Sequence, residues 1–452
     1  MKLKSKGLFP LLSFVLIILL GRTTLVLASP DGNYPGKAQI DWLCRQQNLH
    51  NSGLVQSYER DNDVNAWIFD QALAIIAFTE ANEPNRARRI LDKMKEIQRD
   101  DPNGAWFECY NAPDACYAGC WKYITGPIAW MVMAVNFYEC RTGDSNYANM
   151  AQRALGWLDT MRNTSEDERY GSLRYCENCS IPNAISTEHN FDAYSVYYWR
   201  GMLDANDSDL NKASLILDYL RREMWGPTPG SNCSKDANVF CRGYNDPCIL
   251  ATDCQSWGVL SLGPFGPDGE EFYKSLYWLL DSNLQTTCDF NNTIVDINGF
   301  KSESDELCDY VRVDLTESVA AALYSIGDDA NNISFHNEMM DTIDANGGLV
   351  HSFNWEYPSC EKRYNYVASA AWYYFNEARI NPFNLRPCFA ECRAVNIDKA
   401  GRVDFIDYAK LALDWLETGS DPYLTGDINR DGRVHRVDLD ILTEYWLKDC
   451  NE

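Results

Sequence analysis

Hydrophobic positions between Gly36 and Pro387 recur with helical spacing and are interrupted by loops. We predict twelve helical segments here. They cover residues 38–48, 64–82, 84–99, 124–142, 145–162, 188–205, 209–225, 250–263, 269–283, 314–327, 330–345 and 364–378. Odd-numbered segments, such as the one containing Arg86–Lys93, are amphipathic, as surface helices must be. Even-numbered segments, such as those containing Ile128–Phe137 and Ser318–Tyr324, are apolar nearly all round, as buried helices are.

The connections between these segments alternate in length. Short turns such as Thr142–Asp144 join the second segment to the third, the fourth to the fifth, and so on, whereas long loops rich in Cys and Gly join the remaining pairs. If successive helices are antiparallel, five long loops emerge on one face, where functional residues are expected. Six inner and six outer helices predict an all-α (α/α)6 toroid over residues 36–387.

Several stretches of this body resemble six-hairpin glycosidase-type proteins. They are Trp67–Leu73, Thr125–Trp130, Ser186–Tyr194, Asp253–Gly258 and Asn381–Phe383. The resemblance covers most of the body. It implies a carbohydrate-active protein that hydrolyses a polysaccharide or oligosaccharide, with inversion at the anomeric carbon.

Polar residues gather where the predicted inner helices begin. They are Asp70, Glu188, His189, Asp192, Asp253 and Glu317. Carboxylates also favour helix N-termini for capping and dipole reasons, which explains Asp253 and Glu317 equally well. Glu188 and Asp192 are harder to explain structurally, because their i, i+4 spacing places like charges on one helix face.

Glycoside hydrolysis needs one protonated and one ionised carboxyl group, ~6.5–9.5 Å apart in inverting enzymes. We predict Glu188 as the general acid and Asp70 as the general base, kept ionised by its helix N-terminus. Asp192 would raise the pKa of Glu188 or replace Asp70.

We expect the remaining candidates to bind substrate. His189, Asp253 and Glu317 would supply polar contacts. Trp67, Trp106, Trp130 and Trp257 are candidate platforms for sugar rings, although core packing explains the last two better.

Other functions on the same fold remain open. A polysaccharide lyase would use Tyr or His with Arg or Lys against an acidic sugar. A sugar epimerase would use paired histidines, here His189 and His351. The body could also bind glycans without catalysis.

The C-terminal region repeats itself. Asn396 matches Asp427, 31 residues later, and the same shift aligns Gly401 with Gly432 and Leu411 with Leu442. Each unit is a loop followed by a short helix. We predict that the second loop holds calcium through Asp427, Asn429, Asp431, Arg433 (backbone) and Asp438.

The first loop lacks a side-chain oxygen at its fifth position, Ala400, so weaker binding is expected there. Its predicted ligands are Asn396, Asp398, Arg402 (backbone), Asp404 and Asp407. The duplicated units, with Asp at position 12, resemble type I dockerin modules. The resemblance implies an EF-hand-like domain over residues 393–450 whose folding depends on Ca²⁺, and a possible cohesin-like receptor.

Composition adds the cellular setting. Lys2, Lys4 and Lys6 precede an apolar run from Leu8 to Leu20, which predicts a signal peptide over residues 1–28 rather than an uncleaved anchor. Seventeen cysteines then favour disulfides over zinc in a secreted protein, and Cys44 is a candidate free thiol. The net charge of -25 disfavours nucleic acid and anionic membranes as partners.

Overall fold

The computed structural model describes residues 34–60, 63–116, 118–226, 238–244, 249–289, 296–304, 310–353, 362–385 and 405–413, with residues 397, 415, 426, 428, 434, 439 and 442. The predicted signal peptide lies outside the described residues. The same holds for all the predicted calcium ligands except Asp407, namely Asn396, Asp398, Arg402, Asp404, Asp427, Asn429, Asp431, Arg433 and Asp438. Among the described residues, no helix is both long and apolar enough to cross a bilayer.

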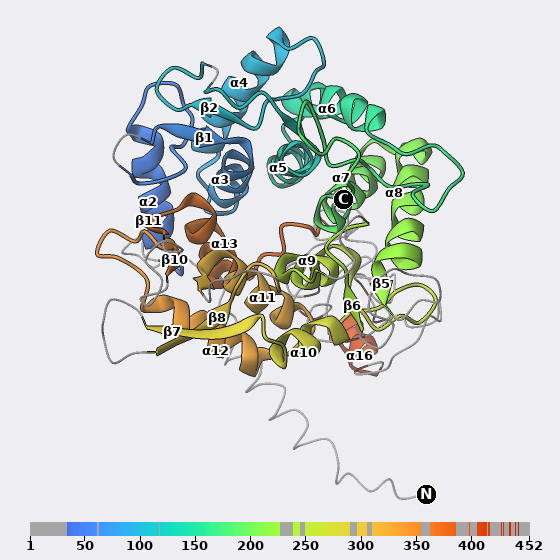
Figure 1. The fold of residues 1–452 in the computed structure, drawn as a ribbon. Coiled ribbons are helices and arrows are strands. Elements are labelled where there is room, and N and C mark those ends of the chain that lie inside the picture. The colour runs from blue at the N-terminus through green and yellow to red at the C-terminus, as the bar shows by residue number, and fades with distance from the viewer. Residues whose placement is uncertain are drawn as a thin grey trace, which may run out of the picture.

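Six inner helices form a closed ring, and six outer helices surround them (Figure 1). The inner helices are α3 (Ile68–Glu80), α5 (Thr125–Thr142), α7 (Thr187–Asp204), α9 (Thr252–Leu262), α11 (Val313–Ser325) and α13 (Val367–Ala378). The outer helices are α2 (Lys37–Asn48), α4 (Pro84–Asp100), α6 (Ala148–Thr160), α8 (Asp207–Tyr219), α10 (Lys274–Leu280) and α12 (Asp329–Met340). Each inner helix packs against the next, and α13 closes the ring on α3. The twelve helices predicted for the body are therefore all present.

Burial follows the expected alternation. Inner helix α3 buries eleven of its 13 residues, whereas outer helix α4 buries five of 17. Pro84 stands at the start of α4, where its missing N–H costs nothing. A helix that is apolar on all sides is most stable when it is enclosed on every side. The sequence alone therefore predicts which helix of each pair lies inside.

The structure also contains short strands that the all-α prediction omitted. They are β1 (Asn65–Trp67), β2 (Cys109–Asn111), β3 (Tyr123–Ile124), β4 (Cys176–Glu177), β5 (Trp225–Gly226), β6 (Val239–Phe240), β7 (Gln285–Asp289), β8 (Asp296–Phe300), β9 (Val311–Arg312), β10 (Val350–Phe353) and β11 (Lys362–Asn365). Strands β7 to β11 form one antiparallel sheet in the order β11-β10-β9-β8-β7. The helix predicted from residue 64 starts at Ile68 because the preceding three residues form β1.

The residue before each inner helix is extended and pairs with a long loop. The six pairs are Trp67 with Cys109, Ile124 with Cys176, Ser186 with Gly243, Ala251 with Glu303, Arg312 with Ser352, and Tyr366 with Tyr58. Each pair links one inner helix to the loop that leads to the next inner helix. We call this ring of paired segments the collar. It confirms that the long loops share one face, and it adds a sixth, between α2 and α3.

A buried side chain fixes the collar at four of its six positions. Each lies four residues after the extended residue: Gln71, Asn190, Gln255 and Thr316. The Gln71 side chain accepts from the Val55 N–H and donates to the Val55 carbonyl, both at 2.8 Å. Asn190 and Gln255 bond Leu173 and Phe240 in the same two-way manner. Each amide thus satisfies a buried backbone unit of a loop.

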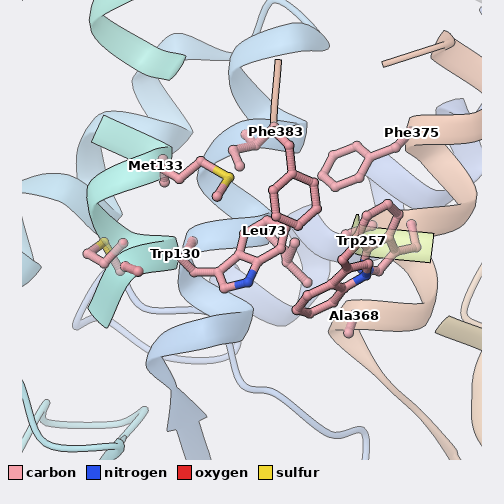
Figure 2. Close-up of a cluster of buried hydrophobic side chains, with 14 of the residues drawn as sticks. Leu73, Trp130, Met133, Trp257, Ala368, Phe375 and Phe383 are labelled. Carbon is pink, nitrogen blue, oxygen red and sulfur yellow. The ribbon is translucent and has the colours of Figure 1, made fainter. Parts of the chain in front are cut away.

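Aromatic side chains fill the axis of the ring. Trp130, Trp257 and Trp372 lie at the same position on α5, α9 and α13, six residues after the extended residue. The Trp130 and Trp257 rings are 5.3 Å apart, and both contact Phe383, which closes the axis (Figure 2). Trp130 and Trp257 are therefore core residues rather than exposed platforms.

The cysteine chemistry favours disulfides. Cys109 pairs with Cys120, and Cys176 pairs with Cys179. The thiol of Cys44 is free and half-buried, as predicted, and burial raises its pKa to about 11.

The described part of the tail contains helix α16 (Phe405–Leu413). Leu411 on this helix and its repeat equivalent Leu442 are both buried, together with Val434. A Cβ on Gly426 would lie 3.0 Å from Leu411 Cα and 3.0 Å from Val434 Cγ1. The two repeat units therefore pack closely on each other.

A buried ion-pair network joins α11, α12 and α13. His336 Nδ1 lies 2.9 Å from a carboxylate oxygen of Glu317, and His336 Nε2 lies 3.0 Å from Glu377. Asn376 donates to the Glu317 backbone carbonyl and to its carboxylate. Burial lowers the pKa of His336, but the two carboxylates outweigh it and raise the pKa to about 10. Glu317, predicted to bind substrate, therefore serves this network instead.

Replacing His336 with Leu should destabilise the body by about 3–5 kcal/mol near neutral pH, because Glu317 stays buried without its cationic partner. The His336 contribution is complete below pH 6.5 and declines as pH rises through about 10. Chemical denaturation across this range measures it. His50→Leu, which removes only a neutral contact with Gln56, is the control. Equal losses in the two variants would contradict the assignment.

Candidate functional site

Three acidic residues occupy one register position on neighbouring inner helices. Glu188, Asp253 and Asp314 each lie two residues after the extended residue that opens α7, α9 and α11. The ring geometry brings these positions together at the collar. Glu188 and Asp253 are partly exposed there, so both residues can be reached from the loop face.

Glu188 is surrounded by other acids. Burial raises its pKa well above the usual value, and the charges of Asp253 and Glu303 raise it further. Arg312 and Arg242 oppose the shift without cancelling it. Burial and the neighbouring acids therefore favour the protonated form of Glu188, which suits a proton donor.

Asp253 has a different balance of neighbours. Burial raises its pKa, but its carboxylate accepts a hydrogen bond from the Cys254 backbone N–H at 2.6 Å, and Arg312 and Arg242 lower the pKa as well. The same two arginines act on both acids, yet only Asp253 gains the backbone donor. Burial thus raises the pKa of both carboxyl groups, and Asp253 has a backbone donor that opposes the rise.

The two arginines are themselves paired with acids. Arg242 Nε lies 3.1 Å from Glu303, and Arg312 binds Asp314 in a bidentate pair at 2.6 and 2.9 Å. Arg312 also donates to Ser302. Both guanidinium groups are therefore already paired with carboxylates of this chain.

Asp192 lies one helical turn below Glu188, in the axial layer of Trp130, Trp257 and Trp372. It is completely buried, and neither carboxylate oxygen has a hydrogen-bond partner of standard geometry among the described residues. Burial raises its pKa well above the usual value, and Glu188 and Asp253 add to this. The predicted proximity of Asp192 and Glu188 is confirmed, but Asp192 has no direct access to the surface.

Asp70 differs from the prediction that it is ionised. Its side chain is 0% exposed, and burial raises its pKa to about 8. The hydroxyls of Ser57 and Tyr366 lower this pKa, although neither reaches standard hydrogen-bond geometry with the carboxylate. Desolvation therefore outweighs the helix N-terminus, and the prediction of an ionised Asp70 is wrong.

The aromatic candidates separate into surface and core. Trp67 is partly exposed at the collar. Trp106 is 0% exposed, and its indole N–H donates to the Met94 carbonyl at 2.9 Å, so it belongs to the core. His189 stacks on Tyr175 with ring centroids 4.7 Å apart, and burial lowers its pKa to about 3. The neutral His189 ring therefore supports the Tyr175 ring from below.

Several residues of this face were missed in the sequence. They are Glu108, Tyr175, Arg242, Glu303 and Arg312, all partly exposed. The charges of Glu188, Glu108, Arg242 and Glu303 all act on the pKa of Tyr175, so the five groups share one neighbourhood. Glu108, Tyr175, Arg242 and Glu303 lie on collar loops, where no helical spacing marks them. The repeated register around the inner helices was the only signal that could have located them.

Asp70→Asn should flatten the pH dependence of stability. The folded protein binds the Asp70 proton more tightly than the unfolded chain does. The stability that this group contributes to the fold is therefore lost as pH rises from about 4 to about 8. The loss is at most about 1.4 kcal/mol per pH unit. Denaturation of wild type and variant at pH 5, 7 and 9 gives the difference. Parallel curves would show that Asp70 titrates normally.

Comparison with known proteins adds the fold relationship. No protein-family model matches the sequence, and no curated protein matches it. Solved structures do match. A glycosidase in complex with glucose has a TM-score of 0.58 at 12% identity and covers 77% of this chain and 96% of its own.

Two further matches have named sources. A novel α-amylase from Clostridium perfringens has a TM-score of 0.54 at 11% identity, over 76% of this chain and 97% of its own. A family 76 glycoside hydrolase, a mannosidase from Bacteroides thetaiotaomicron, has a TM-score of 0.52 at 11% identity, over 77% of this chain and 98% of its own. The body thus has the helical toroid fold of these glycosidases.

Proposed function

We propose that this protein is a glycoside hydrolase in which Glu188 is the general acid. The observation that carries the proposal is the pair Glu188 and Asp253, two partly exposed acidic residues at equivalent register positions, of which Asp253 accepts a backbone hydrogen bond. Glycosidic bond cleavage requires such a pair. The shared fold with solved glycosidases supports the same chemistry.

In this mechanism Glu188 gives its proton to the leaving oxygen as the bond to the anomeric carbon breaks. Asp253 takes a proton from the water whose oxygen bonds to that carbon. Glu188 then regains a proton from solvent and Asp253 releases one. This gives inversion, as the family resemblance implies; a direct attack by Asp253 would give retention.

Asp253 replaces Asp70 as the proposed base because of access. A base must reach water, and the Asp70 side chain is 0% exposed, whereas Asp253 is partly exposed and accepts a hydrogen bond from the Cys254 N–H. Asp192, which is 0% exposed one helical turn from Glu188, is proposed as a positioning residue for Glu188 rather than as the base.

The proposed substrate is a neutral polysaccharide or oligosaccharide. Arg242 and Arg312 are both matched by acids of this chain, so they are poor receptors for the uronate of a lyase substrate. The two histidines of an epimerase would have to face each other, but His189 stacks on Tyr175, whereas His351 contacts the stacked rings of Tyr58 and Tyr366. Because the matching structures include a mannosidase and an α-amylase, mannan and starch are the first substrates to test.

The tail is proposed to be a calcium-dependent dockerin-like module on a secreted enzyme, with a cohesin-like receptor as its partner. Asp407, the predicted ligand at position 12 of the first loop, is fully buried on α16. Lys410 on the same helix donates to the Ile397 carbonyl in that loop at 3.3 Å. These contacts suit a loop folded back on its helix, as calcium coordination requires.

Glu188→Gln and Asp253→Asn should each lower kcat by roughly 10²–10⁴-fold, because each removes one proton transfer. Asp70→Asn should retain most activity. Release of reducing sugar from mannan and starch measures turnover, and NMR of the first product gives the anomeric outcome. The control is Glu177→Gln on β4, which preserves the hydrogen bond from the indole N–H of Trp157 on α6. Loss of activity in Asp70→Asn but not in Asp253→Asn would restore Asp70 as base.

Removing calcium should unfold the tail and leave the body intact. Asp438→Ala should weaken calcium binding more than Asp407→Ala, because the second loop has the fuller set of oxygen ligands. Isothermal titration of both full-length variants measures this, and EGTA should lower the first thermal transition only. Equal affinity in the two variants, or no calcium binding, would contradict the assignment.

A further inference from the structure

Trp121 is an exposed aromatic side chain at the edge of the collar. It exposes 65% of its surface, more than the next most open aromatic among the described residues, Tyr277 at 43%. It lies in the long loop between α4 and α5, just before β3. A ligand that covers this indole would remove apolar surface from water, which is favourable by ~25 cal/mol per Å².

The loop holds Trp121 in a fixed position. The preceding residue, Cys120, is bonded to Cys109 on β2. The Phe107 ring contacts Trp121 edge to face at 5.9 Å and rests on Tyr123 at 4.6 Å. The Glu108 N–H also donates to the Lys122 carbonyl at 3.0 Å. A preorganised ring loses little conformational entropy when a ligand stacks on it.

The same loop belongs to the collar on which the carboxyl pair lies. The Glu108 carbonyl accepts from Ile68 N–H, the first residue of α3, at 3.1 Å, and Cys109 pairs with Trp67. Tyr175 lies within electrostatic reach of both Glu188 and Glu108. Glu188 and Glu108 thus both act on Tyr175, and the residue before Glu108, Phe107, contacts Trp121.

The charge around Trp121 favours a neutral ligand. Lys122 is the residue after Trp121 and carries a positive charge. This charge lowers the pKa of the Glu108 carboxyl group, although burial raises that pKa overall. The face therefore offers a flat apolar ring among matched or acidic charges. The C–H face of a pyranose matches that ring, whereas a uronate would meet the acids.

We infer that Trp121, supported by Phe107 and the Cys109–Cys120 disulfide, is a binding platform for a neutral sugar unit remote from the scissile bond. This inference rests on the proposed glycosidase function. The platform makes the enzyme favour long glycan chains over short ones, because only a long chain occupies the carboxyl pair and Trp121 together.

Kinetics on a disaccharide and a hexasaccharide of the active polymer, mannan or starch, test the platform. Trp121→Ala should raise KM for the hexasaccharide roughly three- to tenfold and leave KM for the disaccharide unchanged. Trp121→Phe should restore most of the affinity. Cys109→Ser/Cys120→Ser should resemble Trp121→Ala, and Tyr277→Ala, on outer helix α10, should have no effect. Equal changes for both substrates, or none, would overturn the platform.

Binding separates this inference from the proposed function. Titration of the Glu188→Gln protein with both hexasaccharides reports the platform without turnover. Trp121-dependent binding by a wild-type enzyme that hydrolyses neither polymer would retain the platform and reject the hydrolase. Hydrolysis with binding that is independent of Trp121 would retain the hydrolase and reject the platform.

Discussion

The structure depends on how six helix N-termini are closed at one end of a ring. The first N–H groups of a helix have no partner within it, and inner helices bury most of their surroundings. The collar answers this constraint by giving every inner helix an extended lead-in that pairs with the next loop. The same pairing gathers the acids of the first helical turns on one face. Structural closure and the placement of Glu188 and Asp253 therefore have one cause.

Helical spacing predicted the ring because it is a local property of the sequence. Burial of α3 and exposure of α4 follow directly from the polarity of their faces. The collar could not be predicted in the same way, because its pairs are one to three residues long and link distant segments. Tyr58 and Tyr366 show this well: neither belongs to an alternating pattern, and only closure of the ring brings them together.

The candidate site was predicted in part for the same reason. Glu188 was identified from its spacing to Asp192, a local feature. The choice between Asp70 and Asp253 depends on burial, which the sequence does not specify: both stand at a helix start, yet only Asp253 is accessible and receives the Cys254 N–H. Trp106 shows the limit for aromatics, because a core indole and a sugar platform look alike in sequence.

The bridge between Tyr58 and Tyr366 also sets when the site is assembled during synthesis. Beside it, Asn365 donates to Glu59 across 306 residues of chain, so the wall around Asp70 is incomplete until the last helix of the body leaves the ribosome. Until then the inner helices can associate only as an open arc. A chain released before α13 would present its apolar edge to chaperones and proteases.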